Sequence, residues 1–334
     1  MTSPPAPPDR RLSVAPMMGW TDRHGRYFLR LVAPRALLYT EMVPAGAIVY
    51  GDTARFLGHD PAEHPLALQV GGCDPAELAD CARTARRFGF AEINLNVGCP
   101  SDRVQRGAFG ACLMKEPDLV AACVAAMRDA GDLPVTVKCR IGVDDRDSEA
   151  ELQDFVGRVA GAGCATFILH ARKAWLQGLS PKENREIPPL DYGRVHRLKS
   201  DFPDLEIVIN GGIEDADAAA GHLARLDGVM IGRAAYRDPW CLTEMETALL
   251  GPGPAPAVRG AVIDRLIPYA EAQARRGVPV KSIARHILGL YKGRPGAARW
   301  RRYLSENVHR ADADADILRQ AAALVETGDA RTAA

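Results

Sequence analysis

Short apolar runs recur along the first part of the chain and are separated by segments of helical length. Runs of this kind are typical of strands buried on both faces of a parallel sheet. The eight runs are Leu12–Met18, Ala36–Val43, Pro65–Gly71, Glu92–Val97, Val135–Ile141, Thr166–His170, Glu206–Asn210 and Gly228–Ile231.

The segments between these runs carry helix start and stop signals. Asp74 and Pro75 open one predicted helix, and Gly89 follows its end. The three clearest predictions are helices from Pro75 to Phe88, from Pro117 to Ala130, and from Ser148 to Gly161 or Gly163. Eight strand–helix units in about 250 residues predict a TIM (β/α)8 barrel over residues 11–250. A doubly wound sheet remains the alternative, because counting strands cannot show that the sheet closes.

The pattern changes after Gly251, where Gly-Pro-Gly-Pro-Ala-Pro indicates a linker. Beyond it no strand signal recurs, and four segments show helical periodicity: Val258–Arg276, Val280–Tyr291, Ala297–Glu306 and Asp314–Glu326. We therefore expect a small all-helical domain over residues 257–330. The Pro-rich, polar residues 1–10 are expected to form a disordered lead-in.

Composition narrows the class of protein. Hydrophobic residues make up 47% and charged residues 25%, which is ordinary for a soluble globular protein. No apolar run approaches the ~20 residues that span a bilayer, so no membrane association is expected. The eight cysteines include no C-x-x-C pair, so neither a metal site nor a disulfide framework is indicated. These features predict a reduced, cytoplasmic protein.

The formal net charge is zero, but the charges are divided unevenly. Residues 1–250 hold 28 basic and 34 acidic side chains, whereas residues 251–334 hold 14 and 8. Between Arg259 and Arg310 there are 12 basic side chains and three acidic ones. A single exposed Arg is usually a solvated surface charge, but an excess of this size is one that any account of the function has to explain.

Polar residues directly follow the predicted strands, and Cys99 stands out among them. The carboxyl ends of barrel strands form the active-site face. Cys99 follows the run Glu92–Val97, between Gly98 and Pro100, on a turn that we expect to face the barrel mouth. An ordinary thiol is mostly protonated at neutral pH, so it can act as a general acid as well as a nucleophile. The alternative is a cysteine that packs a tight turn.

Other strand ends carry side chains that suit a cofactor or an anionic substrate. Lys138 is costly to bury without a partner, and it could form a Schiff base or neutralise an anionic flavin ring. His170 shares the same rim, and the amide of Gln69 suits a flavin pyrimidine edge. The glycines and the arginine after the last two strands indicate a phosphate grip, for a phosphorylated substrate or for FMN equally well: Gly211, Gly212, Gly232 and Arg233.

Several longer motifs resemble those of the flavin-dependent tRNA-dihydrouridine synthases. They are Ala15-Pro-Met-Met18, Trp20-Thr-Asp-Arg-His24, Leu95-Asn-Val-Gly-Cys-Pro-Ser101, Asn210-Gly-Gly212 and Gly232-Arg233. Two further strings resemble the A subfamily, which acts at tRNA positions 20 and 20a: Gly178–Leu190 and Trp300–Asn307. The resemblance runs from about Leu12 to Asn307.

The resemblance implies a bound FMN that NADPH reduces. Reduced flavin would deliver hydride to C6 of a uridine in the tRNA D-loop, and Cys99 would protonate C5, giving 5,6-dihydrouridine. The implied FMN contacts are Pro16, Met17, Met18, Gln69, Lys138, His170, Asn210, Gly211, Gly212, Gly232 and Arg233. No obligate protein partner is indicated.

The same resemblance gives the basic segment a partner, tRNA. Its implied RNA contacts are Lys182 and Arg185 in the loop after Thr166–His170, with Arg299 and Arg302 in the helical domain. Asn96 and Arg140 are our candidates for contacting the uracil edge. Three alternatives remain open: another FMN barrel acting on a free pyrimidine or enone, a Schiff-base aldolase or lyase using Lys138, and a pure RNA-binding module.

Overall fold

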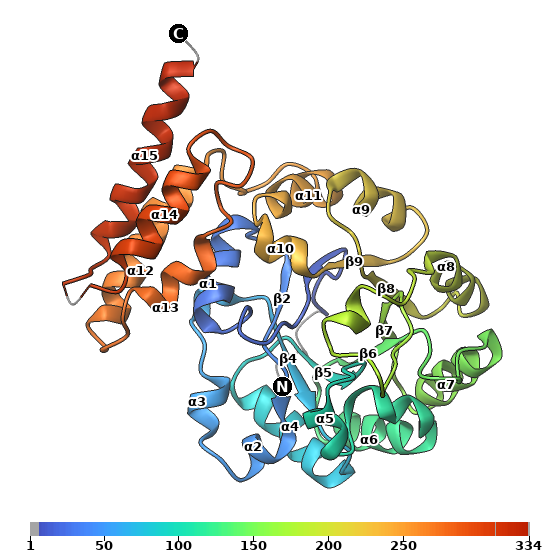
Figure 1. The fold of residues 1–334 in the computed structure, drawn as a ribbon. Coiled ribbons are helices and arrows are strands. Elements are labelled where there is room, and N and C mark those ends of the chain that lie inside the picture. Colours follow the sequence, from blue (N-terminus) through green and yellow to red (C-terminus); the bar gives the residue numbers. More distant parts are fainter. Residues whose placement is uncertain (1–6, 311, 333–334) are drawn as a thin grey trace.

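Eight parallel strands close into a barrel at the centre of the molecule (Figure 1). The computed structural model describes residues 7–310 and 312–332. The barrel strands are β1 (Leu12–Val14), β2 (Leu37–Tyr39), β4 (Leu66–Gly71), β5 (Glu92–Val97), β6 (Val135–Arg140), β7 (Thr166–His170), β8 (Glu206–Asn210) and β9 (Gly228–Ile231). Because β1 pairs with β9 and β2 pairs with β4, the ring is complete and the doubly wound alternative is wrong.

Two predicted strands are shorter than their apolar runs. In the first run only Leu12–Val14 pairs, and the residues after it turn into the barrel mouth. The run Ala36–Val43 is divided between β2 and a two-residue strand, β3 (Val43–Pro44), which pairs with the end of β4.

Helices surround the barrel and connect its strands. They are α1 (Arg23–Val32), α2 (Ala45–Val49), α3 (Thr53–Leu57), α4 (Pro75–Arg87), α5 (Asp102–Arg106), α6 (Pro117–Asp129), α7 (Glu149–Gly161), α8 (Tyr192–Asp201), α9 (Ala216–Leu223), α10 (Arg233–Arg237) and α11 (Cys241–Leu250). Short 3-10 helices occur at Pro61–Glu63, Gly110–Lys115 and Glu183–Arg185. Asp74 caps α4 and Ser148 caps α7, as their sequence signals predict.

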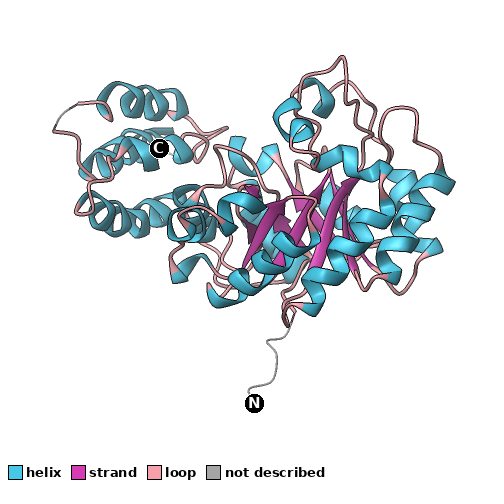
Figure 2. Cartoon of the chain, turned by 90° about the horizontal axis from the view of Figure 1, so that it is seen from below, coloured by secondary structure: helices cyan, strands magenta, loops and turns pink. Residues whose placement is uncertain are grey.

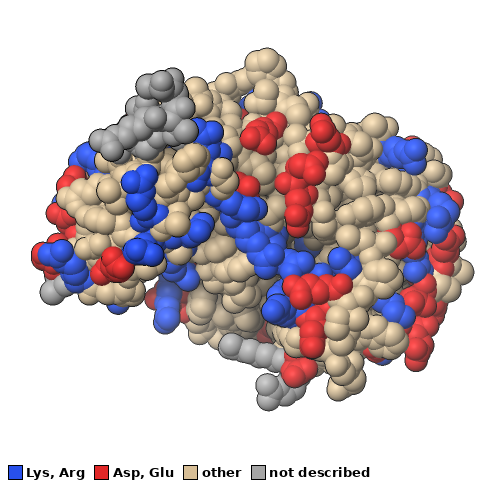
Figure 3. Space-filling view, turned by 45° about the horizontal axis from the view of Figure 1, so that its top comes forward, with Lys and Arg blue, Asp and Glu red and all other residues tan. Residues whose placement is uncertain are grey.

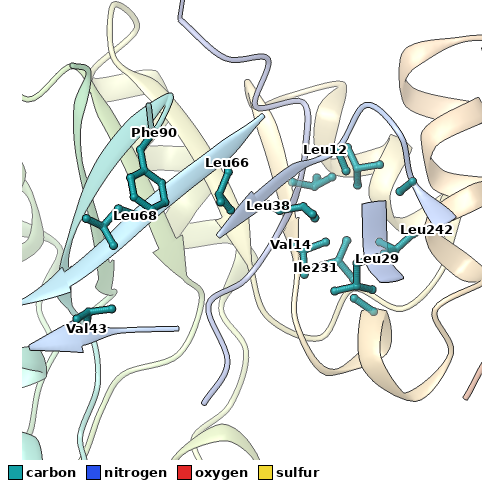
Figure 4. Packing of buried hydrophobic residues seen from close by; sticks show 14 of the residues in the cluster. Leu12, Val14, Leu29, Leu38, Val43, Leu66, Leu68, Phe90, Ile231 and Leu242 are labelled. Carbon is teal, nitrogen blue, oxygen red and sulfur yellow. The ribbon is translucent and has the colours of Figure 1, made fainter. Parts of the chain in front are cut away.

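The side chains of each strand alternate between two separate cores. Outward-facing residues pack against the helices, and Figure 4 shows Val14 and Ile231 beside Leu29 of α1 and Leu242 of α11. Inward-facing residues include a smaller apolar cluster: Ala15, Leu37, Tyr39, Ala67, Ile168, Val208 and Met230. The rest of the interior, on the side of β4 to β7, is polar.

The floor of the barrel is held by buried ion pairs. Arg10 is 5% exposed, and its guanidinium contacts Glu92 of β5 and Glu206 of β8, each at 2.7 Å. Arg10 therefore belongs to the folded barrel and not to the lead-in expected over residues 1–10. Residues 1–6 of that predicted segment lie outside the described residues.

Four helices form a bundle beside α1, on one side of the barrel (Figures 1 and 2). They are α12 (Arg259–Ala274), α13 (Lys281–Ile287), α14 (Ala297–Asn307) and α15 (Asp316–Thr332). Trp300 of α14 is fully buried, and its indole N–H donates to the backbone oxygen of Ile287 at 3.3 Å. Among the described residues, no helix has both the length and the apolar character that a membrane crossing needs.

Candidate active site

A cavity of about 420 Å³ opens at the carboxyl ends of the strands. Its volume lies within the range of small-molecule sites. The structure brings most of the predicted site residues to this cavity: Pro16, Met17, Met18, Gln69, Asn96, Cys99, Lys138, Arg140, His170, Arg185, Asn210, Gly211, Gly212, Gly232 and Arg233. The predicted rim is therefore one continuous site in space.

Cys99 lies on a turn that several hydrogen bonds hold in place. The side-chain Oδ1 of Asn96 accepts from the backbone N–H groups of Gly98 and Cys99, at 3.1 and 3.0 Å. The Cys99 carbonyl accepts from Ala111 N at 2.8 Å, and a Cβ on Gly110 would lie only 2.5 Å from that same oxygen. The thiol is half-buried, with its Sγ 3.5 Å from the hydroxyl of Ser101.

Three ionisable side chains face the cavity, and none of them pairs with a carboxylate in the part of the chain that the structure describes. Burial, together with the nearby Arg140, lowers the pKa of Lys138 to about 8. Burial also lowers the pKa of Arg140 to about 10. Burial and these two cations lower the pKa of His170 well below its usual range. Lys138 and Arg140 make the cavity electropositive.

Arg140 is tied to the protein backbone. Its Nε donates to Gly98 O at 3.1 Å, and its Nη1 donates to Lys173 O and Asn184 O at 3.2 and 3.0 Å. The side chain is 3% exposed. One buried guanidinium thus connects the Cys99 turn to the loop that follows β7.

The predicted phosphate grip is contacted by that same loop. Arg233 pairs with Glu186 at 2.7 Å, and its Nη2 donates to Arg185 O at 3.2 Å. Gly211 and Gly212 both have positive φ, and a Cβ on Gly212 would lie 2.5 Å from Leu190. The backbone conformation and the close packing therefore explain these glycines without reference to a ligand. Helix α10 has only five residues, and Arg233 places a positive charge at its first position.

Three predicted RNA contacts lie outside the cavity lining. Lys182 is exposed in the loop after β7, and Arg299 and Arg302 are exposed on α14. Figure 3 shows Lys and Arg side chains in a band that runs from the helical bundle to the barrel face. The band thus links the helical bundle to the barrel.

Sequence reasoning missed several residues that line the cavity. Arg172, Trp20, Met42 and Glu214 were not among the predicted site residues. Arg172 lies two positions beyond the end of β7, so its place after a strand could have identified it. Met42 offered no such signal. With Arg172 included, the lining holds five Arg or Lys side chains and, among the described residues, the one carboxylate Glu214.

A cluster of side chains connects the cavity wall to the helical bundle. Asp22 caps α1 through the amides of His24 and Gly25, and it also pairs with Arg285 and His286 of α13. Burial raises the pKa of Asp22, but its contacts with His286, the Gly25 amide and Arg285 outweigh burial and hold that pKa well below the usual value. We call Trp20, Asp22, Tyr236, Arg285 and His286 the joint.

Aromatic contacts complete the joint. Trp20, which lines the cavity, stacks on Tyr236 of α10 with ring centroids 4.3 Å apart. The hydroxyl of Tyr236 donates to Arg285 O at 3.0 Å. The bundle is therefore attached to the two segments, Met17–Trp20 and α10, that form one side of the cavity.

Comparisons with known proteins agree with this arrangement. The family model described as "Dihydrouridine synthase (Dus)" matches residues 13–326. The tRNA-dihydrouridine(20/20a) synthase of Shewanella oneidensis is 56% identical over 319 residues, which cover 96% of this chain and 95% of the relative. The enzyme of the same name from Escherichia coli K12 is 57% identical over 316 residues, covering 94% and 91%.

A solved structure supports the fold alone. Morphinone reductase superposes with a TM-score of 0.52 at 14% identity, covering 78% of this chain and 94% of that one. At this identity the likeness extends to the TIM barrel and not to the substrate.

Proposed function

Because this chain belongs to the dihydrouridine synthase family, we propose that it reduces the C5=C6 bond of uridine in tRNA, giving 5,6-dihydrouridine. The curated relatives named for positions 20 and 20a, matched over nearly the full chain, support the same D-loop positions here. The observation that carries the proposal is the half-buried thiol of Cys99 in one cavity with Lys138 and His170.

The cavity fits an anionic, flat cofactor such as FMN. Its lining combines an apolar wall at Pro16, Met17 and Met18 with five Arg or Lys side chains and, among the described residues, one carboxylate. Buried cations without carboxylate partners are unfavourable, and an anion among them removes that cost. Flavin chemistry in the family therefore agrees with the electrostatics of this chain.

The proposed FMN contacts divide between the ring and the phosphate. Pro16, Met17 and Met18 would lie along the ring, while Gln69, Lys138 and His170 would contact its polar edge. The phosphate would be held by Arg233 and the backbone around Asn210, Gly211, Gly212 and Gly232. When bound, the flavin would supply the hydride that uridine C6 receives, and NADPH would reduce the flavin again.

Cys99 is the proposed proton donor to C5. Addition of hydride at C6 places negative charge on the uracil, and a proton delivered to C5 completes the reduction. The hydrogen bonds from Gly98 and Cys99 to Asn96 hold the thiol turn toward the cavity. The Nδ2 amide of Asn96 carries two N–H groups, and with one donated to Gln69 the other can serve a uracil carbonyl. Arg140 is a second candidate, although three of its contacts are to backbone oxygens.

The basic band is the proposed tRNA surface. A uridine must leave its stack to reach the barrel mouth, so the enzyme has to hold the RNA while the base is extruded. Phosphate contacts supply that hold largely without sequence information. The proposed contacts are Lys182 in the loop after β7, Arg185 in the cavity lining, and Arg299 and Arg302 on α14.

The proposal is tested by incubating the purified protein with FMN, NADPH and unmodified tRNA, followed by nucleoside analysis. Dihydrouridine is expected at positions 20 and 20a and not in reactions that lack NADPH. A tRNA in which both positions are cytidine serves as the control. If an FMN-loaded protein leaves the uridines unchanged, the proposed function is wrong. A colourless protein that borohydride links to a carbonyl substrate at Lys138 would favour the Schiff-base alternative.

A further inference from the structure

A line of polar side chains runs through the barrel interior from the Cys99 turn to the floor. Asn96 Nδ2 donates to Gln69 Oε1 at 2.8 Å, and Gln69 Nε2 donates to Asn94 Oδ1 at 2.7 Å. Asn94 Nδ2 donates to the Thr136 hydroxyl at 2.8 Å, and that hydroxyl donates to Glu92 Oε1 at 2.6 Å. We call these five residues the relay.

The relay exists because strand geometry places its members on one face. Residues two apart in a strand point the same way, so Glu92, Asn94 and Asn96 of β5 all face inward. The neighbouring strands supply Gln69, which is in register with Asn94, and Thr136, which is also in register with Asn94. All five side chains are at most 9% exposed.

The groups at the two ends of the relay both require the same donor-to-acceptor order in the hydrogen bonds between them. At the mouth, the donors are the backbone N–H groups of Gly98 and Cys99, so Asn96 must present its oxygen to them. At the floor, the Glu92 carboxylate accepts from Arg10 at 2.7 Å and from Tyr39 at 2.6 Å. A carboxylate paired in this way only accepts, so the Thr136 hydroxyl donates to it. Every amide between the ends then has a single orientation that satisfies its neighbours.

We propose that Thr136 and Glu92 are positioning residues for the reaction, acting on the Cys99 turn and on Gln69 through the relay. The inference rests on the proposed function, because that function places Asn96 and Gln69 at the site of the thiol and the flavin. Thr136 is the critical link. Its hydroxyl accepts from a neutral amide and donates to a carboxylate, and no apolar side chain does both. Without it, the Asn94 amide loses its acceptor and can turn over, and Gln69 and Asn96 lose the constraint on their own amides.

The chain offers a matched control on the next strand. Thr166 of β7 is in register with Thr136, and its hydroxyl donates to Glu206 at 2.8 Å. Both threonines are buried and both bond a carboxylate that contacts Arg10. Thr166 does not bond an amide of the relay. Thr136→Val and Thr166→Val therefore remove the same group at the same depth, and Thr136→Ser restores the hydroxyl.

Hydrogen exchange of the cofactor-free protein provides the first measurement. The amides of Gly98 and Cys99 should exchange about 10-fold faster in Thr136→Val, and at the wild-type rate in Thr166→Val and Thr136→Ser. The second measurement is the FMN-loaded protein. The visible flavin spectrum should shift in Thr136→Val alone, and flavin reoxidation at saturating tRNA should slow about 10-fold while the KM for tRNA stays the same.

Equal behaviour of Thr136→Val and Thr166→Val in exchange and spectrum would overturn the proposal. If the wild-type protein produced no dihydrouridine, the proposed function would fail, whereas the exchange comparison would still decide whether the relay orders the turn. Thermal unfolding and FMN content show whether Thr136→Val is folded. If it is not, Asn94→Leu provides the second variant, because it removes both the acceptor of the Gln69 amide and the donor to Thr136. Unchanged exchange at Cys99 in Asn94→Leu would also contradict the proposal.

Discussion

Lys138 and Asn210 meet across the barrel mouth, where the ammonium of Lys138 donates to the Asn210 side-chain oxygen at 3.1 Å although 72 positions separate the two residues. The amide of Asn210 is held in turn, since its Nδ2 donates to Met230 O at 2.8 Å. Lys138 therefore has a neutral partner and, within residues 7–310 and 312–332, no carboxylate partner. This accounts for the pKa of about 8, because one amide oxygen compensates only in part for burial.

In the cofactor-free protein, burial of the Lys138 ammonium should lower the free energy of unfolding by an amount that depends on pH. Because the folded pKa of Lys138 lies below the ordinary 10.5, the unfolded chain binds more protons between pH 8 and 10.5, and the lysine's contribution to stability rises across that window. Lys138→Met should be more stable than wild type at pH 7 by about 1–3 kcal/mol, and the difference should shrink above pH 8. Urea unfolding at pH 7, 8, 9 and 10 measures it. A difference that stays constant or widens with pH would contradict the interpretation.

Removal of the Cys99 thiol should slow the reaction without weakening the binding of FMN or tRNA. Cys99→Ala is expected to lower the rate of dihydrouridine formation at least about 100-fold, because it removes the proton donor and leaves the turn's backbone contacts in place. Affinities for FMN and tRNA should stay within about twofold. Cys73, which is also half-buried, provides the control, and Cys73→Ala should retain full activity. Wild-type turnover by Cys99→Ala would exclude the thiol from the mechanism.

The basic band should act through phosphate contacts. Reversing charge in Arg299→Glu with Arg302→Glu should weaken tRNA binding and reduce the slope of log K against log salt by about 1 for each phosphate that the protein no longer neutralises. Arg158→Glu is the control, because Arg158 is exposed on α7 and pairs with Asp118 and Asp154. Filter binding at several salt concentrations gives the slope. If the slope in the double variant equals that of Arg158→Glu, α14 does not contact the RNA backbone.

The sequence was most informative where a signal is local. Apolar runs located all eight barrel strands, and cap residues such as Asp74 and Ser148 located helix starts within a residue or so. The positions after strand ends identified most of the cavity lining, since every parallel strand delivers its last residues to one face. Closure of the barrel could not be predicted from local signals, because it depends on the pairing of β2 with β4 and of β1 with β9.

The partners of charged and polar groups could not be predicted in the same way. Nothing near Arg233 in the chain indicates Glu186, and nothing near Glu92 indicates Arg10. Thr136 lies in a β-rich apolar run, where a threonine is ordinarily a good strand former and no more. Its role became visible only when the barrel placed it beside Asn94. Pairings of this kind depend on the register between neighbouring strands, and no local signal in a single sequence reveals that register.

The joint makes a prediction about how the helical bundle is positioned. Asp22→Asn keeps a good cap for α1, because asparagine caps helices about as well as aspartate, but it removes the charge that Arg285 and His286 contact. The variant makes the protein more positive, so simple electrostatics would strengthen tRNA binding. We expect the opposite, a KM for tRNA raised about 5–10-fold, because α13 loses its attachment to the cavity wall. Reduction of the flavin by NADPH, which needs no RNA, should be unchanged.

Asp74→Asn is the matched control for that variant. Asp74 caps α4 through the amides of Ala76 and Glu77, and α4 lies in the barrel. The two variants therefore lose the same charge from the same kind of cap, and only Asp22 contacts the bundle. A raised KM in both would indicate an effect of net charge or of capping. A KM for Asp22→Asn at or below the wild-type value would show that the bundle keeps its position without the ion pair, because the Tyr236 bond to Arg285 O and the packing of α1 against α12 and α13 would then suffice.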